Sequence, residues 1–249
     1  MDYLSEVSQD LGQSKPLSSC LRYSLSSPNQ EVGGVFYFNE SFSDYNFLNI
    51  QSKNLIEKNF FSCSDSTFYK LFKENRVISL FHTHIESGPE LSDFDIEIAN
   101  SFILPSCVFS VKTKEFNLYY PENFKPRPLS KRIFIPMFQD CITFVKDFYL
   151  KHMQINLHAI TNNWARDRKN SNEILINVLN DNFFEVNKKD LKYGDIIVMS
   201  PLDSRYFHLV VYLGSNEVFH HPMFMLPRKE FIKPEALNKV YKVYRYKEG

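Results

Sequence analysis

The sequence lacks several features that mark specialised classes of protein. No run approaches the ~18–20 uninterrupted apolar residues of a membrane-spanning helix, so no membrane span is predicted. Only 7 of the 249 residues are glycine, which excludes collagen-like architectures. Basic and acidic side chains are balanced at 29 each, and no cluster of Lys and Arg with interleaved aromatics occurs. We therefore expect no nucleic-acid partner.

Cysteine is scarce, and a secretion signal is absent. The first residues, Met1 to Glu6, have neither the basic start nor the apolar run of such a signal, so we expect synthesis in a cytoplasm. A disulfide framework is not expected there. The four cysteines form no Cys-x-x-Cys pair, which argues against a thiolate zinc ribbon. What is abundant is aromatic: 24 Phe and 14 Tyr, with 43% hydrophobic residues overall, predict a folded chain with an aromatic core.

Proline placement predicts two domains. Three prolines among basic and polar residues between Pro121 and Arg132 cannot continue a helix or a central strand. We place a linker at residues 125–132, between an N-terminal domain at 1–124 and a C-terminal domain at 133–249. Each half then has a size that is ordinary for a domain.

The two halves differ in the order of their expected elements. In the first half, apolar periodicity predicts strands at 31–38, 77–84 and 107–111 and a helix at 91–102. Strands alternating with helices indicate an α/β fold. In the second half it predicts helices at 141–149 and 172–179, then strands at 195–199, 208–213 and 217–220. Helices followed by an antiparallel sheet indicate an α+β fold.

A candidate zinc site occurs in the first half. His82 and His84 are two residues apart on a predicted strand, so both imidazoles project to one face. Asp95 lies near the start of the next helix, which can turn its carboxylate toward them. Two His and one carboxylate form an open zinc site whose fourth ligand is water, and zinc lowers the pKa of that water toward ~7. Glu31 is the candidate general base, and Ser92 can donate a hydrogen bond to an oxyanion.

Each of these residues also has an ordinary structural explanation. A His-x-His pair is commonly satisfied without a metal, and Ser92-x-x-Asp95 fits a helix capping box. Glu31 alone is compatible with a surface carboxylate.

Taken in order, the five residues, followed by a helix and a strand, resemble the JAMM metallopeptidase (MPN domain) family over residues 10–120. The resemblance implies a cytidine-deaminase-like α/β fold and a zinc-dependent isopeptidase or peptidase. It implies the ligands His82, His84 and Asp95, the general base Glu31 and the oxyanion donor Ser92. Ile85 stands where this family usually has proline after the second His.

A candidate thiol site occurs in the second half. Asp140 is a plausible N-cap for a helix that begins at Cys141, and the positive end of the helix dipole is expected to depress the pKa of that thiol. His208 and His220 lie on neighbouring predicted strands. There His208 can act as base to the cysteine and His220 can orient His208. His221 is the alternative third member, and a merely packed cysteine is the structural alternative.

The landmarks around these residues are similar to the NlpC family of papain-like cell-wall peptidases over residues 133–245. They are Asp140-Cys141, Leu191-Lys-Tyr-Gly-Asp195, His208-Leu-Val-Val-Tyr-Leu-Gly214 and Phe219-His220-x-Pro222. The resemblance implies cleavage of peptidoglycan stem peptides by Cys141, His208 and His220. Two features depart from the family. Ile142-Thr143 replaces the usual Ser-Gly, and the upstream Tyr that often assists the oxyanion hole has no evident equivalent.

A JAMM domain joined to an NlpC-type domain resembles tail-assembly proteins of lambda-like, long-tailed bacteriophages. This resemblance implies other tail-tip proteins as partners, synthesis in the host cytoplasm, and a position at the phage tail tip with action in the periplasm or cell wall. Two further hypotheses stay open. One is a structural tail-tip component with one or both sites inactive. The other is a cytoplasmic bacterial peptidase acting on recycled wall fragments or ubiquitin-like tails.

Overall fold

The chain divides into two compact units, Met1–Pro126 and Arg127–Gly249, in a computed structural model. The structure describes residues 16–26, 30–50, 66–135, 138–157, 171–200, 207–223, 225–233, 236 and 239–247. The division falls inside the expected linker, 125–132, but most of that segment is not a free connection. Leu129, in the short 3₁₀ helix η1 (Leu129–Lys131), is buried in the core of the second unit. Residues 127–132 therefore fold with that unit.

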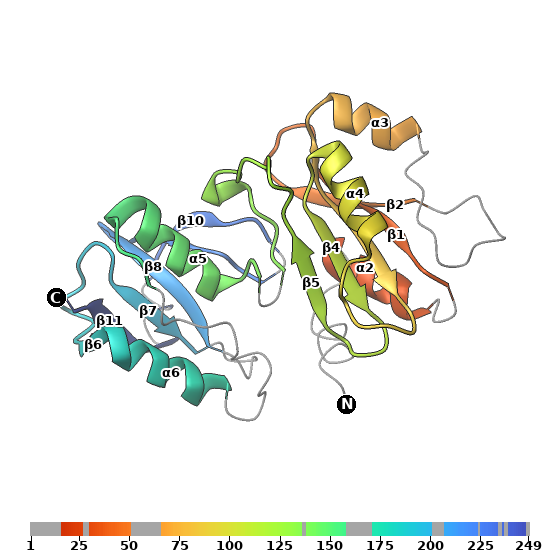
Figure 1. The fold of residues 1–249 in the computed structure, drawn as a ribbon. Helices are drawn as coiled ribbons and strands as arrows, with labels where there is room; N and C mark the ends of the chain where they lie inside the picture. Colours follow the sequence, from red (N-terminus) through yellow and green to blue (C-terminus); the bar gives the residue numbers. More distant parts are fainter. Residues whose placement is uncertain are drawn as a thin grey trace. The chain divides into compact units, whose positions relative to one another are not determined.

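The first unit is built on a five-stranded mixed sheet with the order β2-β1-β3-β4-β5 (Figure 1). Neighbouring strands are antiparallel except β3 and β4, which are parallel. A parallel pair needs a crossover, and α4 (Asp93–Phe102) supplies it. The strands are β1 (Gly33–Phe38), β2 (Tyr45–Ile50), β3 (Val77–His84), β4 (Ser106–Ser110) and β5 (Phe116–Tyr119).

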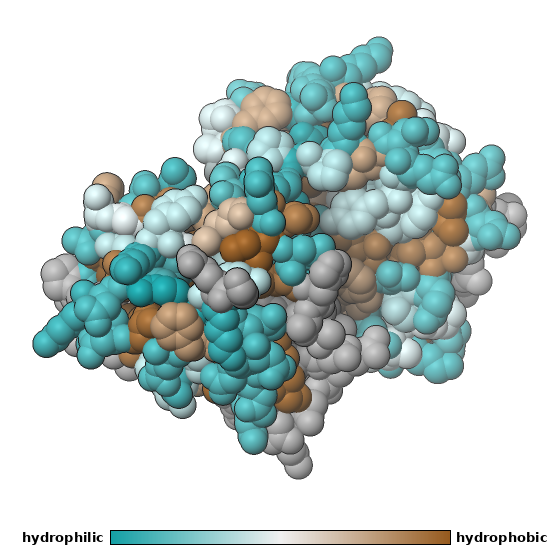
Figure 2. Space-filling model, turned by 60° about the vertical axis from the view of Figure 1, so that its left-hand side comes forward, coloured by the Kyte–Doolittle hydropathy of each residue, from teal (hydrophilic) through white to brown (hydrophobic). Residues whose placement is uncertain are grey.

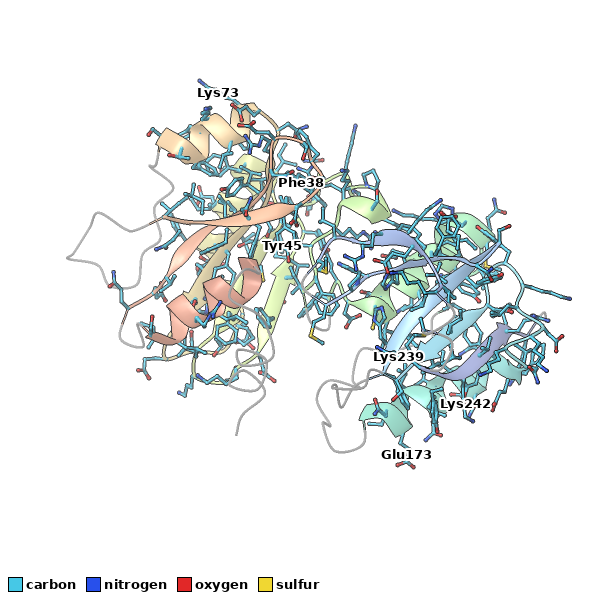
Figure 3. All side chains as sticks on the ribbon, turned by 180° about the vertical axis from the view of Figure 1, so that it is seen from behind. Phe38, Tyr45, Lys73, Glu173, Lys239 and Lys242 are labelled. Carbon is cyan, nitrogen blue, oxygen red and sulfur yellow. The ribbon has the colours of Figure 1, made fainter. Side chains whose placement is uncertain are left out.

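Helices cover both faces of this sheet. The views of Figures 1 and 3 place α4 on one face and α2 (Pro16–Ser26) on the other. On the α4 face, Leu80 of β3 packs in one core cluster with residues of α3 (Ser66–Lys73) and α4. On the opposite face, the rings of Phe36 and Phe81 meet edge to face, with centroids 5.8 Å apart. Because side chains alternate along β3, Leu80 shares its face with the even-numbered residues that follow.

The second unit is built on a six-stranded antiparallel sheet with the order β10-β9-β8-β7-β11-β6. Its helices are α5 (Cys141–Phe148), which continues into the π-helical turn η2 (Tyr149–Met153), and α6 (Ser171–Asn182). The strands are β6 (Phe183–Val186), β7 (Ile196–Met199), β8 (His208–Gly214), β9 (Glu217–His220), β10 (Arg228–Phe231) and β11 (Val240–Tyr246).

Both faces of this second sheet bury apolar side chains, but unequally. Phe144 and Phe148 of α5 pack in the larger cluster with Leu209 and Phe219 of the sheet. The rings of Phe144 and Phe219 meet edge to face at 4.7 Å. A smaller cluster on the other face contains Val210, together with Ile197, Tyr212 and Val218. The larger cluster seats the N-terminus of α5 against β8.

The predicted elements are all present, with ends within three residues of the expected ones. The α/β order of the first unit and the α+β order of the second are confirmed. Elements that the sequence analysis did not predict are α2, α3, β2, β5, β6, β10 and β11. Among the described residues, no helix combines the length and the apolar character needed to cross a bilayer. Figure 2 shows a surface face on which hydrophilic side chains predominate, with scattered exposed apolar residues, as is usual for folded proteins.

Candidate active sites

His82, His84 and Asp95 lie together in the first unit. The Nε2 atom of His82 is 3.2 Å from Nε2 of His84 and 3.1 Å from Oδ1 of Asp95. The Nε2 atom of His84 is 3.6 Å from Oδ2 of Asp95. One possible ligand atom from each residue falls within 4.8 Å of the other two. The strand β3 and the N-terminus of α4 thus bring the three predicted ligands to one point.

Neighbouring groups fix the orientation of these side chains. The Nδ1 atom of His84 is 2.9 Å from the carbonyl oxygen of Gly88, which leaves Nε2 facing Asp95. Burial alone raises the pKa of Asp95, but hydrogen bonds from His82, His84 and Ser92 outweigh it and hold that pKa well below its usual range. The hydrogen bond with Asp95 raises the pKa of His84. The cluster is therefore a tightly coupled polar group.

Glu31 lies beside this cluster. Residue 31 comes two positions before Gly33, which is opposite His82 in the β1–β3 register. Thr83 anchors this stretch, because its Oγ1 accepts a hydrogen bond from the Val32 amide at 2.8 Å. Burial raises the pKa of Glu31, and its carboxylate interacts electrostatically with both histidines and with Asp95. The predicted general base is thus a half-buried neighbour of the predicted ligands.

Ser92 acts as the N-cap of α4. Its Oγ donates to Oδ2 of Asp95 at 2.6 Å and accepts from the Asp95 amide at 3.3 Å. The Ser92 amide donates to the same Asp95 oxygen at 2.8 Å. The capping box expected from Ser92-x-x-Asp95 is confirmed. In this structure the Ser92 proton is directed to Asp95.

Cys141 is the first residue of α5. Asp140 caps this helix, since its Oδ1 accepts hydrogen bonds from the amides of Ile142 at 3.0 Å and Thr143 at 2.9 Å. The predicted N-cap is therefore confirmed. In turn, the Oγ1 atom of Thr143 accepts a hydrogen bond from the Asp140 amide at 2.7 Å. Thr143, which stands where the family usually has Gly, thus supplies the reciprocal hydrogen bond of a capping box.

The expected depression of the Cys141 pKa is wrong. Burial raises the pKa of the thiol to about 12, and the adjacent Asp140 carboxylate adds to the rise. Backbone amides of Leu209, Cys141 and Ile142 favour the thiolate, as the dipole argument requires, but they do not outweigh burial. The Cys141 thiol is therefore neutral near pH 7.

His208 and His220 are in direct contact. The Nε2 atom of His208 is 2.8 Å from Nδ1 of His220. The β8–β9 register produces this contact, because His220 lies opposite Val210, two residues along from His208. Burial lowers the pKa of His208 to about 3 and also lowers that of His220, so both rings are neutral near pH 7. The Leu209 amide, next to His208, is directed at the Cys141 thiol. Among the described residues, no direct hydrogen bond joins this thiol to His208.

His221 lies in an apolar environment instead. Its ring meets Phe134 edge to face at 5.2 Å and lies 6.1 Å from the Phe144 ring. Burial lowers its pKa to about 3. The described residues offer no hydrogen-bond partner to its Nε2 atom. Of the two candidates for third member, His220 is the one that contacts His208.

The Gly194-Asp195 landmark has a structural role. Gly194 has a φ of +87°, a left-handed conformation that favours glycine. Asp195 is buried, and Arg245 binds both of its carboxylate oxygens at 2.8 Å. This ion pair joins the residue that precedes β7 to the strand β11.

The sequence analysis missed Glu230, on β10. Its Oε2 atom is 3.4 Å from Nε2 of His220. Residues 228–231, Arg-Lys-Glu-Phe, are three charged residues followed by one Phe, so they lack the alternation that predicts a strand and do not reveal which strand β10 pairs with.

Comparison with known proteins gives a family match in the second unit and a structural similarity over most of the chain. The NlpC/P60 family model matches residues 134–238. No curated protein matches the chain. Among solved structures, the chain is similar to an NlpC/P60 family protein from Bacillus cereus ATCC 10987, with 15% identity and a TM-score of 0.31. That similarity covers 90% of this chain and 66% of the other, so the chain spans just under two thirds of its length. The family implies a hydrolase of the cysteine-peptidase class directed at cell-wall peptides. Residues 134–238 of this chain are an NlpC/P60 domain.

Proposed function

We propose that the second unit is a cysteine endopeptidase that cleaves peptidoglycan stem peptides. Cys141 is its nucleophile, His208 its general base and His220 the residue that orients His208. The observation that carries this proposal is the 2.8 Å contact between His208 and His220 inside the NlpC/P60 domain. The position of Cys141 at a capped helix N-terminus beside the Leu209 amide supports it.

The neutral state of both partners indicates when the proton moves. In the resting enzyme the thiol keeps its proton, because its pKa is about 12 while that of His208 is about 3. His208 takes the proton as the sulfur attacks the scissile carbonyl carbon and a C–S bond forms. The C–N bond then breaks and His208 returns the proton to the leaving amine. Water hydrolyses the thioester, which regenerates the thiol.

The experiment is incubation of the full chain with purified muropeptides, followed by mass spectrometry of the products. The wild type is expected to split the stem peptide, and Cys141→Ala to abolish the split. Cys107→Ala is the matched control, because Cys107 is also a buried free thiol and belongs to the first unit. Equal hydrolysis by Cys141→Ala and the wild type would place the nucleophile elsewhere.

A second activity, in the first unit, is proposed on a separate observation. His82, His84 and Asp95 offer two imidazole nitrogens and a carboxylate oxygen within 4.8 Å of one another, a donor set that fits zinc. A zinc ion held there would supply Lewis acidity. Glu31, half-buried beside the cluster, is placed to accept a proton. Ser92 would act as an oxyanion donor only when its hydroxyl turns from Asp95.

Metal content tests this second proposal independently of any substrate. The purified chain is expected to hold about one zinc per molecule, measured by inductively coupled plasma mass spectrometry after dialysis. His84→Ala and Asp95→Ala should each lose it. His152→Ala is the matched control, since His152 belongs to the second unit, where its ring lies 4.7 Å from the Phe148 ring. Unchanged zinc content in either ligand variant would refute the assignment.

The biological setting proposed for the chain is a bacteriophage tail tip. The paired JAMM-like and NlpC-like motifs resemble tail assembly protein K of lambda-like phages. In that setting the protein is made in the host cytoplasm, binds other tail-tip proteins, and cleaves the wall during entry. The zinc-dependent unit would act on a peptide or isopeptide bond in an unidentified target. The alternative is a structural tail component with inactive sites, which predicts no hydrolysis in either assay.

A further inference from the structure

Glu230 is an acidic side chain beside the histidine pair. It lies on β10, two residues beyond Arg228, which is opposite His220 in the β9–β10 register. Because side chains two residues apart share a face, Arg228, Glu230 and His220 lie on the same side of the sheet. The Oε2 atom of Glu230 is 3.4 Å from Nε2 of His220, within ion-pair distance but without hydrogen-bond geometry, and that nitrogen has no hydrogen-bond partner among the described residues. The Oε1 atom of Glu230 is ion-paired with Nε of Arg228. Each carboxylate oxygen thus has a separate cationic or imidazole neighbour.

A carboxylate can only accept hydrogen bonds, and this constrains the ring beside it. Facing Glu230, the Nε2 atom of His220 must carry the ring proton, since two acceptors facing each other repel. The Nδ1 atom of His220 is then a lone pair, which accepts from Nε2–H of His208 at 2.8 Å. The remaining nitrogen of His208, Nδ1, is consequently the one left without a proton. A base that takes the thiol proton needs such a free nitrogen.

Without the carboxylate, the opposite arrangement is equally allowed. His220 can then carry its proton on Nδ1 and donate to Nε2 of His208. This moves the His208 proton to Nδ1 and blocks it as a base. Both rings are neutral near pH 7, because burial lowers their pKa values, so each holds a single proton that one nitrogen or the other must carry.

We infer that Glu230 is a positioning residue that selects the reactive tautomer of His208 through His220. This inference rests on the proposed thiol peptidase activity. The ordinary structural explanation is a surface ion pair with Arg228. Both side chains are about two-fifths exposed, 43% and 41%, and such pairs contribute little to stability. Loss of Glu230 should therefore change chemistry more than folding.

The test compares the full-length wild type with Glu230→Gln and Glu230→Ala. Nitrogen NMR of histidine-labelled protein reads the tautomers directly, and His208→Gln and His220→Gln assign the signals. In the wild type at pH 7 both rings should carry their proton on Nε2. In the variants they should populate both tautomers. Glu217→Gln is the matched control, because Glu217 lies on β9 in the same hairpin and faces Phe231 in the register.

Muropeptide kinetics provide the second readout. We expect kcat of Glu230→Gln to fall by roughly ten- to a hundred-fold, by analogy with the loss of carboxylates that orient metal-bound histidines, with KM unchanged. Unchanged tautomers, or a kcat within two-fold of the wild type, would overturn the inference. If the wild type itself does not hydrolyse muropeptides, the proposed function fails, while the tautomer spectra still decide the role of Glu230.

Discussion

Replacement of His221 by Phe is expected to make the second unit more resistant to acid. His221 is 1% exposed and packs against the rings of Phe134 and Phe144, so a phenyl ring fits the same environment. Arg132 and the titratable His220 ring also lower the pKa of His221, and a backbone hydrogen bond with Met225 raises it. This hydrogen bond does not outweigh burial, which is the largest effect, and the pKa of His221 falls from an ordinary value of 6.5 to about 3.

The sign follows from proton binding. In the unfolded chain His221 takes up a proton below pH 6.5, but in the folded chain it does so only near pH 3. The unfolded state therefore binds more protons in between, and stability is lost as the pH falls from 6.5 toward 3. At pH 4 this one group lowers the free energy of unfolding by about 3 kcal/mol, at 1.36 kcal/mol per pH unit below 6.5. At pH 7.5 it is close to zero.

His221→Phe removes this penalty while giving up the Met225 hydrogen bond, which costs about 1 kcal/mol at every pH. The variant should be slightly less stable than the wild type at pH 7.5 and more stable at pH 4. Urea unfolding followed by hydrogen exchange of the β8 and β9 peptides measures both at matched pH. The variant should also keep muropeptide hydrolysis, because His220 is the ring that contacts His208. A difference between the proteins that does not change with pH would refute the reasoning.

Three further predictions concern the second unit. Iodoacetamide should alkylate Cys141 more slowly at pH 7 than it alkylates a free cysteine, because burial raises the pKa of Cys141 to about 12. The alkylation rate should rise about ten-fold per pH unit up to pH 10. Mass spectrometry of the modified peptide measures this rate, and rapid alkylation at pH 7 would contradict the prediction. Arg245→Met should destabilise the unit by about 3–5 kcal/mol in urea, because it leaves the buried Asp195 carboxylate without its cationic partner. The comparison variant Lys242→Met, which removes a solvent-accessible pair with Glu185 and a contact with the Tyr241 ring, should cost under about 1 kcal/mol. Phe144→Ala should cost about 3–5 kcal/mol by opening a cavity beneath Phe219; a loss below 1 kcal/mol would show that α5 does not depend on this contact.

Local patterns predicted the elements that carry the candidate sites. The strand β3 is recognisable in the sequence because its residues from Val77 to Phe81 are largely apolar, and in the structure Val77 to Thr83 are all buried. The His-x-His spacing then follows from strand alternation. Helix α5 is recognisable from its cap at Asp140 and its apolar spacing. Where a residue's neighbours in sequence determine its position, the sequence is sufficient.

Other features depend on distant parts of the chain. Helix α2 contains four serines, which are neutral or unfavourable in helix interiors, so tertiary burial of Cys20 and Leu21 stabilises it. The helix dipole at Cys141 is readable from sequence, but the burial that outweighs it is not. The pairing of β10 with β9, which places Glu230 beside His220, joins short strands whose partners the sequence does not specify.

Acid-quenched mass spectrometry of the intact protein would test the thiol mechanism most directly. After brief mixing with a muropeptide, the wild type should carry an added mass equal to the acyl fragment, and peptide mapping should locate it on Cys141 as a thioester. His208→Gln should accumulate little adduct, and Cys141→Ala none. An adduct on another residue, or stem-peptide cleavage that proceeds fully in Cys141→Ala, would contradict the account.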